Sequence, residues 1–135
     1  MIKKIEHIGI AVENPQKSNE IFEKLFGETS YKSELVESEG VKTYFYQLGE
    51  SKIELLESVK ENSPIEKFIS KRGQGMHHIA FYVDDIHLEL DRLTNLGFEP
   101  IGGIKEGADN KLICFIHPKT TGGVLIELCQ EQGQL

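Results

Sequence analysis

Apolar and polar residues alternate in two similar stretches of the chain, residues 5–14 and residues 75–85. A period of two is typical of a half-buried strand, and turn-forming residues bound both stretches. Superposing the stretches aligns His7 with His78, 71 positions later. Each stretch is therefore predicted to open one half of the chain, and the halves are predicted to be copies of one module.

A second pair of apolar stretches closes the two halves. Residues 53–57 and 124–129 both read as strands, and their superposition aligns Glu54 with Glu127, 73 positions later. Because two separate stretches align at nearly the same offset, the repeat extends over the whole module.

Helical spacing of apolar residues separates these strands. Asn14 followed by Pro15 predicts a helix start, because the asparagine side chain can cap the helix and proline needs no N–H there. Gly27 is typical of a helix end, and Asp84 or Asp85 is predicted to start the equivalent helix of the second half. The order that we expect is strand 5–12, helix 15–26, strands 31–36, 41–48 and 53–57, a linking helix 63–73, strand 75–83, helix 86–96, and strands 98–103, 111–117 and 124–129.

Both halves therefore read β-α-β-β-β, and we expect an α+β protein with a single domain over residues 1–135. Module one should span about residues 3–58, the linking helix about 63–73, and module two about 75–130. Only two copies are present, which favours a paired-module fold over a solenoid. If each module curls its sheet, the two form a curved mixed sheet around a central cleft.

Composition and charge exclude several classes of function. The chain has 15 basic and 22 acidic residues, a net charge of −7, and no basic cluster, so we expect no nucleic-acid partner. Its apolar runs fall far short of the roughly 20 residues that cross a bilayer, and no secretory segment precedes the first strand. We therefore expect a cytoplasmic protein with no membrane partner. Cys114 and Cys129 lie among strand-like apolar residues and are predicted to be reduced core thiols.

Two histidines and two glutamates occupy matching places in the two modules. Because strand side chains alternate between faces, His77 and His78 point to opposite sides, and the repeat selects His78 as the partner of His7. Glu54 and Glu127 each stand between apolar neighbours and point to the other face of their sheet. If the modules face one cleft, the four side chains can converge and hold Zn²⁺, Co²⁺, Ni²⁺, Mn²⁺ or Fe²⁺.

Structural roles remain open for each of these residues. A single strand histidine is more often a hydrogen-bonded structural residue than a ligand, and a single strand glutamate is more often exposed to solvent. Recurrence of both residue types in both modules raises the weight of a metal site. His87 is predicted to lie on a helix surface, and His117 is either structural or in contact with substrate.

The chain resembles the vicinal oxygen chelate superfamily, also called the glyoxalase/bleomycin-resistance superfamily, whose members pair two βαβββ modules around a metal. Within it, the resemblance is closest to the methylmalonyl-CoA epimerases and covers essentially the full length. It implies a glyoxalase-like fold with a metal cleft. The matching stretches are residues 7–12, 53–57, 63–65, 75–81, 83–86, 117–119 and 122–129.

The resemblance also implies a site and a reaction. His7, His78 and Glu127 correspond to metal ligands, and Glu54 falls at the fourth ligand position, where epimerases can carry Gln. The reaction interconverts 2R- and 2S-methylmalonyl-CoA by proton transfer at C2 through a metal-stabilised enolate; a base alone contributes only about 10²- to 10⁴-fold. Glu127 is the implied catalytic acid/base. The second acid/base is unassigned, because Thr43 stands on the third strand where the family carries an acid.

Substrate, cofactor and assembly follow from the same resemblance. A small-molecule acyl-CoA thioester is the expected substrate, and the residues expected to bind it are His117, Lys119, Gly122 and Gly123. The expected cofactor is a divalent ion, namely Co²⁺, Zn²⁺, Ni²⁺ or Mn²⁺, and the expected assembly is a homodimer.

Other functions use the same fold. A lactoylglutathione lyase (glyoxalase I) acts on a glutathione hemithioacetal with the same ligand types, and residues 117–123 favour the epimerase over it. A non-catalytic binding or resistance protein of this fold generally lacks a full ligand set. A dioxygenase needs only three ligands, so Glu54 would be an awkward fourth.

Overall fold

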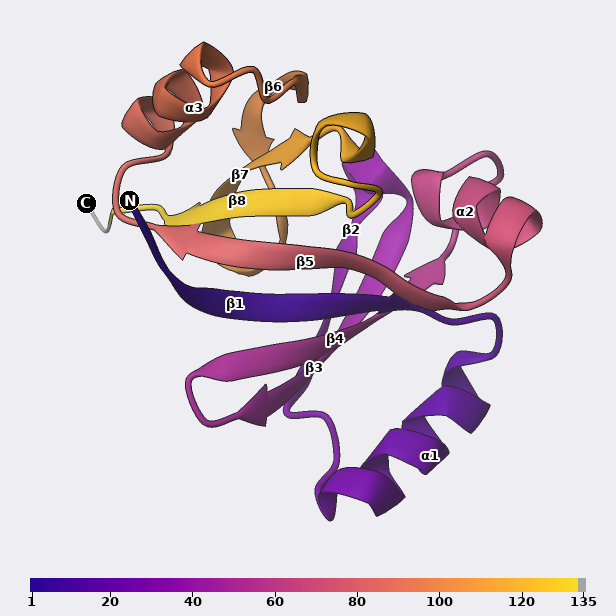
Figure 1. The fold of residues 1–135 in the computed structure, drawn as a ribbon. Coiled ribbons are helices and arrows are strands. Elements are labelled where there is room, and N and C mark those ends of the chain that lie inside the picture. The colour runs from indigo at the N-terminus through magenta and orange to yellow at the C-terminus, as the bar shows by residue number, and fades with distance from the viewer. Residues whose placement is uncertain (134–135) are drawn as a thin grey trace. The chain divides into compact units, whose positions relative to one another are not determined.

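The computed structural model describes residues 1–133, and its elements follow the predicted order (Figure 1). Two β-α-β-β-β modules are joined by a helix, which confirms the predicted α+β class. The first module contains β1 (Ile2–Ala11), α1 (Pro15–Phe26), β2 (Lys32–Val36), β3 (Val41–Leu48) and β4 (Ser51–Ser58). After α2 (Pro64–Arg72) come β5 (Gly75–Val83), α3 (Ile86–Asn95), β6 (Pro100–Glu106), β7 (Lys111–Ile116) and β8 (Ile126–Glu131), and short 3₁₀ helices lie at Glu37–Glu39, Ala108–Asn110 and Pro118–Thr120.

The helices begin where the capping residues predict. Asn14 accepts a hydrogen bond from the Lys17 backbone N–H at 3.1 Å, and Pro15 follows in the first turn of α1. Of the two aspartates proposed to start α3, Asp85 is the cap, since it accepts the Leu88 backbone N–H at 3.1 Å. Short polar side chains satisfy the first free N–H groups of these helices, as the sequence indicates.

Two strands of the second module differ in extent from the prediction. β6 begins at Pro100 rather than Phe98, because the Phe98 backbone N–H still bonds to the Leu93 carbonyl at the end of α3, at 3.0 Å. β8 begins at Ile126 rather than Val124, because the preceding loop closes on itself through a 2.8 Å bond from the Gly123 N–H to the Pro118 carbonyl. Local turns therefore occupy residues that propensity assigns to strands.

Contacts within the chain divide it into two compact units. The terminal unit contains Met1–His7 together with the chain from His78 onward, and the central unit contains Ile8–His77. These boundaries fall inside β1 and inside β5. The spatial units therefore do not coincide with the repeated modules, because the first half of β1 belongs to the unit that holds module two.

In the central unit the strand order is β2-β3-β4-β1, and the β2–β3 and β3–β4 pairs are antiparallel. Phe22 and Phe26 of α1 pack in one apolar cluster with Leu55 of β4. Ile65 of α2 packs in another cluster with Leu56. Since consecutive strand residues point to opposite faces, α1 and α2 cover opposite faces of this sheet.

In the terminal unit the strand order is β1-β5-β8-β7-β6, with β8 parallel to β5 and antiparallel to β7. Ile86 and Leu93 of α3 pack with Leu128 and Cys114 on one face of the sheet. Cys129 belongs to a separate cluster on the opposite face. Both cysteines are buried and free, which confirms the prediction of reduced core thiols.

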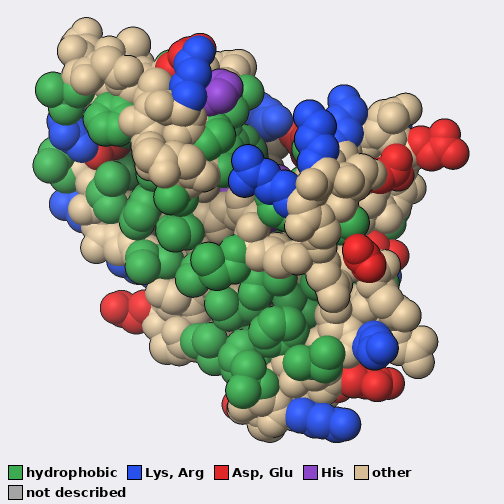
Figure 2. Space-filling model, turned by 45° about the vertical axis from the view of Figure 1, so that its right-hand side comes forward, with side chains coloured by type: hydrophobic (Ala, Val, Ile, Leu, Met, Phe, Trp, Pro, Cys, Tyr) green, Lys and Arg blue, Asp and Glu red, His purple; other side chains and the backbone are tan. Residues whose placement is uncertain are grey.

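Large apolar side chains also remain on the surface, as the green areas of Figure 2 illustrate. On α1, Ile21 and Leu25 are 55% and 69% exposed although they share the helical spacing of the buried side. The apolar stripe of α1 is therefore wider than the face that packs on the sheet. None of the helices among residues 1–133 is long and apolar enough to span a membrane.

Candidate metal centre

The face of the terminal-unit sheet opposite α3 carries His78 and Glu127. His78 lies on β5 two residues before Ala80, and Ala80 pairs in parallel register with Glu127 of β8. Strand alternation therefore places both side chains on the face away from the α3 cluster. Phe115 of β7, in register with Glu127, contacts the His78 ring edge to face at a centroid distance of 5.6 Å.

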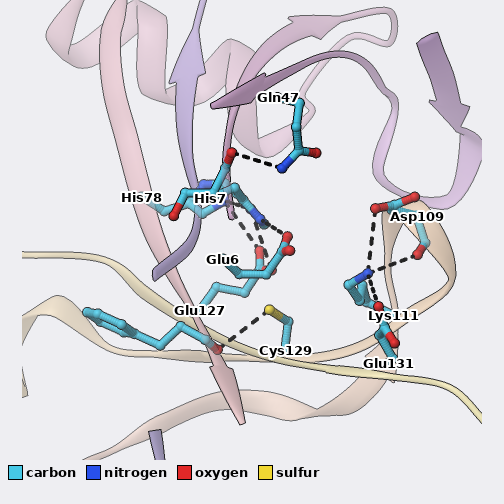
Figure 3. A network of polar contacts seen from close by, with 11 residues as sticks. Glu6, His7, Gln47, His78, Asp109, Lys111, Glu127, Cys129 and Glu131 are labelled. Carbon is cyan, nitrogen blue, oxygen red and sulfur yellow. Dashed lines mark hydrogen bonds and ion pairs between the residues drawn. The ribbon is translucent and has the colours of Figure 1, made fainter. Parts of the chain in front are cut away.

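His7, in the terminal-unit part of β1, completes a compact group with these two residues (Figure 3). Its Nε2 lies 3.0 Å from Nε2 of His78 and 3.7 Å from Oε2 of Glu127. Nε2 of His78 lies 3.3 Å from Oε1 of Glu127. The three residues are 5 to 7% exposed, so the structure brings these three predicted ligands together in one buried place.

The spacing of these atoms fits coordination of one ion. Ligand atoms bonded to Zn²⁺ or a similar ion at ~2.1 Å lie about 3.0 to 3.4 Å apart for octahedral to tetrahedral angles. The observed spacings of 3.0, 3.3 and 3.7 Å need only small adjustments to meet that range. Two imidazoles and one carboxylate are also a donor set that borderline divalent ions accept.

The environment of Glu127 favours its ionised form. Burial raises the pKa of a carboxyl group, but the attraction of His7 in its protonated form and the hydrogen bond from His78 outweigh that effect. The pKa of Glu127 therefore lies below its ordinary value. At neutral pH this side chain is a carboxylate, the state that a metal ligand and a general base both require.

Sequence reasoning missed Glu6. Its Oε1 lies 2.9 Å from Nδ1 of His7, and its side chain is almost fully buried. Strand alternation predicts that neighbours such as Glu6 and His7 face opposite sides, so the pattern gave no reason to pair them. The acidic residue beside a predicted ligand was the only available signal.

When His7 and His78 are both neutral, the hydrogen bonds indicate which ring nitrogen of each carries the proton. An ionised Glu6 only accepts, so Nδ1 of His7 donates and its Nε2 accepts. The single proton on Nε2 of His78 then faces both Nε2 of His7 at 3.0 Å and Oε1 of Glu127 at 3.3 Å. A metal held at Nε2 of both histidines would require His78 to carry its proton on Nδ1 instead, because each ligand atom must present a lone pair.

The other predicted site residues of the first module lie in the central unit. Glu54 on β4 is 4% exposed and stands in register with Phe45 of β3. Thr43, in register with Leu56, is 2% exposed and shares the face of Phe45 and Glu54. This unit therefore holds one buried carboxylate and one buried hydroxyl on one sheet face, and Glu54 stays a predicted ligand.

His77 and His78 are separated as strand alternation predicts. His77 is half-buried in the central unit, where its ring meets Phe68 of α2 edge to face at 4.9 Å. His78 instead joins His7 in the terminal unit. The packing of His77 on α2 matches the structural role expected of it. His87 is exposed on α3, as predicted.

The predicted substrate-binding residues lie in the loop between β7 and β8. His117 accepts the Lys119 backbone N–H through Nδ1 at 3.1 Å, and Nζ of Lys119 pairs with Glu99 at 2.9 Å. Gly122 and Gly123 have φ values of 69° and 95°, a region that residues with a Cβ rarely adopt. His117 therefore shapes the loop, and its role toward a substrate stays a prediction.

Comparison with known proteins assigns the class to which this chain belongs. The profile of the Glyoxalase/Bleomycin resistance protein/Dioxygenase superfamily matches residues 6–115. This protein belongs to that superfamily, which confirms the resemblance and the glyoxalase-like fold.

Within the superfamily the chain is similar to methylmalonyl-CoA epimerases. It is 39% identical to the mitochondrial methylmalonyl-CoA epimerase of Dictyostelium discoideum over 94% of this chain and 78% of that protein. It is 37% identical to Uncharacterized protein YqjC of Bacillus subtilis over 98% of this chain and 95% of that protein. A single-substitution variant of the Streptomyces coelicolor methylmalonyl-CoA epimerase, solved in complex with 2-nitronate-propionyl-CoA, matches with a TM-score of 0.91 at 28% identity, over 98% of this chain and 100% of that one.

Proposed function

We propose that this protein is a metal-dependent epimerase that interconverts 2R- and 2S-methylmalonyl-CoA by proton transfer at C2. The observation that carries the proposal is the buried group of His7, His78 and Glu127, whose ligand atoms lie 3.0 to 3.7 Å apart in a chain similar to epimerases. The complex of the Streptomyces coelicolor enzyme with an acyl-CoA compound supports the substrate class.

His7, His78 and Glu127 are the proposed ligands of the divalent ion, and Glu54 is predicted as the fourth ligand. When bound, a divalent ion supplies Lewis-acid polarisation of a carbonyl oxygen, which lowers the pKa of the adjacent C–H. Co²⁺, Zn²⁺, Ni²⁺ and Mn²⁺ all suit this donor set. The donor set therefore indicates a borderline divalent ion and does not distinguish among these four.

Glu127 is the proposed acid/base on one side of C2. Its lowered pKa keeps it unprotonated at neutral pH, so it is ready to remove a proton before it returns one. Inversion also needs a proton partner on the other side of the planar enolate. The Thr43 hydroxyl cannot take up and return the C2 proton as a carboxylate does. The second proton partner is therefore unassigned.

Proton exchange in D₂O tests this proposal. With Co²⁺ present, each epimer of methylmalonyl-CoA should gain deuterium at C2, and NMR should show inversion of configuration. If Glu127 is the main base, one epimer should exchange faster than it inverts, because the opposite side lacks an equivalent acid. Absence of exchange from both epimers in metal-loaded protein would contradict the epimerase function.

A parallel assay separates the epimerase from glyoxalase I. The same metal-loaded protein should leave the hemithioacetal of methylglyoxal and glutathione unchanged while it acts on methylmalonyl-CoA. Turnover of the hemithioacetal alone would instead establish the lactoylglutathione lyase.

Residues of the β7–β8 loop and the assembly complete the proposal. His117, Lys119, Gly122 and Gly123 are proposed to contact the acyl-CoA, and the protein is proposed to be a homodimer. Equilibrium sedimentation of the pure protein tests the assembly, since a monomer at all concentrations would contradict it.

A further inference from the structure

We infer that Glu6 is a positioning residue of the candidate metal centre: its carboxylate holds His7 in the tautomer whose Nε2 lone pair faces His78 and Glu127. The inference rests on the metal centre of the proposed function. It concerns a residue to which neither the repeat nor the family resemblance gives a role.

The geometry assigns a separate task to each nitrogen of the His7 ring. Nδ1 lies 2.9 Å from Oε1 of Glu6, whereas Nε2 lies 3.0 Å from His78 and 3.7 Å from Glu127. When a carboxylate accepts a hydrogen bond from Nδ1–H of a neutral imidazole, Nε2 is left unprotonated. A histidine that donates its other N–H to a carboxylate is also a more basic and better oriented metal ligand.

Burial makes this hydrogen bond effective. Glu6 and His7 are 5% and 6% exposed, so water competes poorly for either group. An ionised carboxylate is costly to bury unless hydrogen bonds or charges compensate it, and His7 supplies a hydrogen bond. The same low polarity strengthens the preference for Nδ1–H over Nε2–H in His7.

Glu6 acts on the ion through His7 in this arrangement. Its Oε1 contacts Nδ1 of His7, whereas His78 and Glu127 lie at Nε2, on another edge of the ring. Removal of Glu6 should therefore weaken metal binding less than removal of a ligand does. This difference separates a positioning residue from a ligand.

Two measurements on the full-length protein test the inference. One is the Co²⁺ affinity, obtained by competition with a chelating dye. The other is the tautomer of His7 in metal-free protein, read from its ¹⁵N chemical shifts at a pH where the imidazoles are neutral. Glu6→Ala should weaken Co²⁺ binding about 10- to 100-fold and move His7 away from the Nδ1–H tautomer. Glu6→Gln, whose amide oxygen can still accept from Nδ1, should keep the tautomer and lose less affinity.

Glu89→Ala is the matched control. Glu89 is another buried carboxylate of the terminal unit, but it binds Arg92 on α3, at 2.8 and 2.9 Å. This variant should keep wild-type Co²⁺ affinity and the wild-type tautomer of His7.

The outcomes separate the inference from the proposed function. Glu6→Ala with wild-type affinity and tautomer would overturn the role of Glu6. If that variant fails to fold, a loss in Glu6→Gln as large as that in His7→Ala would overturn it as well, since Glu6 would then behave as a ligand. Wild-type protein that binds no Co²⁺ would overturn the metal centre itself, and with it the inference.

Discussion

The hairpins β3–β4 and β7–β8 hold the same residues at matching places and differ in what surrounds them. In each, a phenylalanine stands in register with a glutamate, Phe45 with Glu54 and Phe115 with Glu127. Within the terminal unit, His7 and His78 both lie beside Glu127. The repeat therefore supplies a common frame, whereas the residues that neighbour each glutamate determine its chemistry.

A second difference lies two residues before each phenylalanine. The central unit has Thr43 there, and the terminal unit has Ile113. Thr43 and Ile113 are both buried, at 2% and 7% exposed, so the two positions differ chiefly in the polarity of the side chain. A buried hydroxyl needs a hydrogen-bond partner and a buried isoleucine does not, so the polar position is the one more open to a functional role.

The largest expected effect comes from neutralising each glutamate in turn. Glu127→Gln removes the proposed base and one anionic ligand, so the epimerisation rate should fall about 10²- to 10⁴-fold. Glu54→Gln should lower the epimerisation rate less than about 10²-fold, because Glu54 is proposed to act as a ligand that glutamine can replace. Turnover of methylmalonyl-CoA measures both variants, and equal losses would remove the contrast between the hairpins.

The next effect concerns the neighbouring histidines of β5. His78→Ala removes a proposed ligand and should weaken Co²⁺ binding more than about 100-fold. Loss of a residue that only hydrogen-bonds a ligand costs about 10- to 100-fold. His77→Ala loses a ring contact with Phe68 in the central unit and should retain the metal. Chelator competition measures both affinities. Equal loss in both variants would show that strand alternation assigns the wrong histidine.

These results bear on what the sequence could predict. Strand alternation and the 71-residue offset predict His78 rather than His77 as the partner of His7, and His78 does lie beside His7 in the structure. The register of Phe115 with Glu127 follows from the same regularity. Features that repeat in both modules were therefore accessible from the sequence.

Features that depart from the regular alternation of a strand could not be predicted from the sequence. Glu6 reaches His7 although they are adjacent on β1, where alternation predicts opposite faces. The boundary between the units falls after His7, inside one continuous strand, so no loop or change of composition marks it. The start of β6 was misplaced because a backbone bond from Phe98 to Leu93 extends the end of α3. Such details depend on tertiary packing, which overrides local propensity.

Matched core substitutions compare the stability of the two units. Leu55 and Leu128 each follow one of the glutamates, and each is completely buried. Replacement of either by alanine leaves a cavity and should lower the free energy of unfolding by about 2 to 5 kcal/mol. If the chain is one domain as predicted, both variants should lower a single cooperative transition in urea followed by circular dichroism. Two separable transitions, with one variant affecting each, would show that the units unfold independently.

The smallest expected effect is a gain rather than a loss. Thr43 stands where the family resemblance predicts an acid, so Thr43→Glu should supply the missing proton partner and speed inversion up to about 10²-fold. The new carboxylate is buried, which raises its pKa and costs stability, so the variant must be assayed below its unfolding midpoint. Thr43→Gln is the matched control, since it adds a side chain of similar size without an acid. If inversion is faster in Thr43→Glu and not in Thr43→Gln, the second proton partner is the group that is missing at position 43. If neither variant changes the ratio of inversion to deuterium exchange, the second proton partner lies elsewhere in the chain.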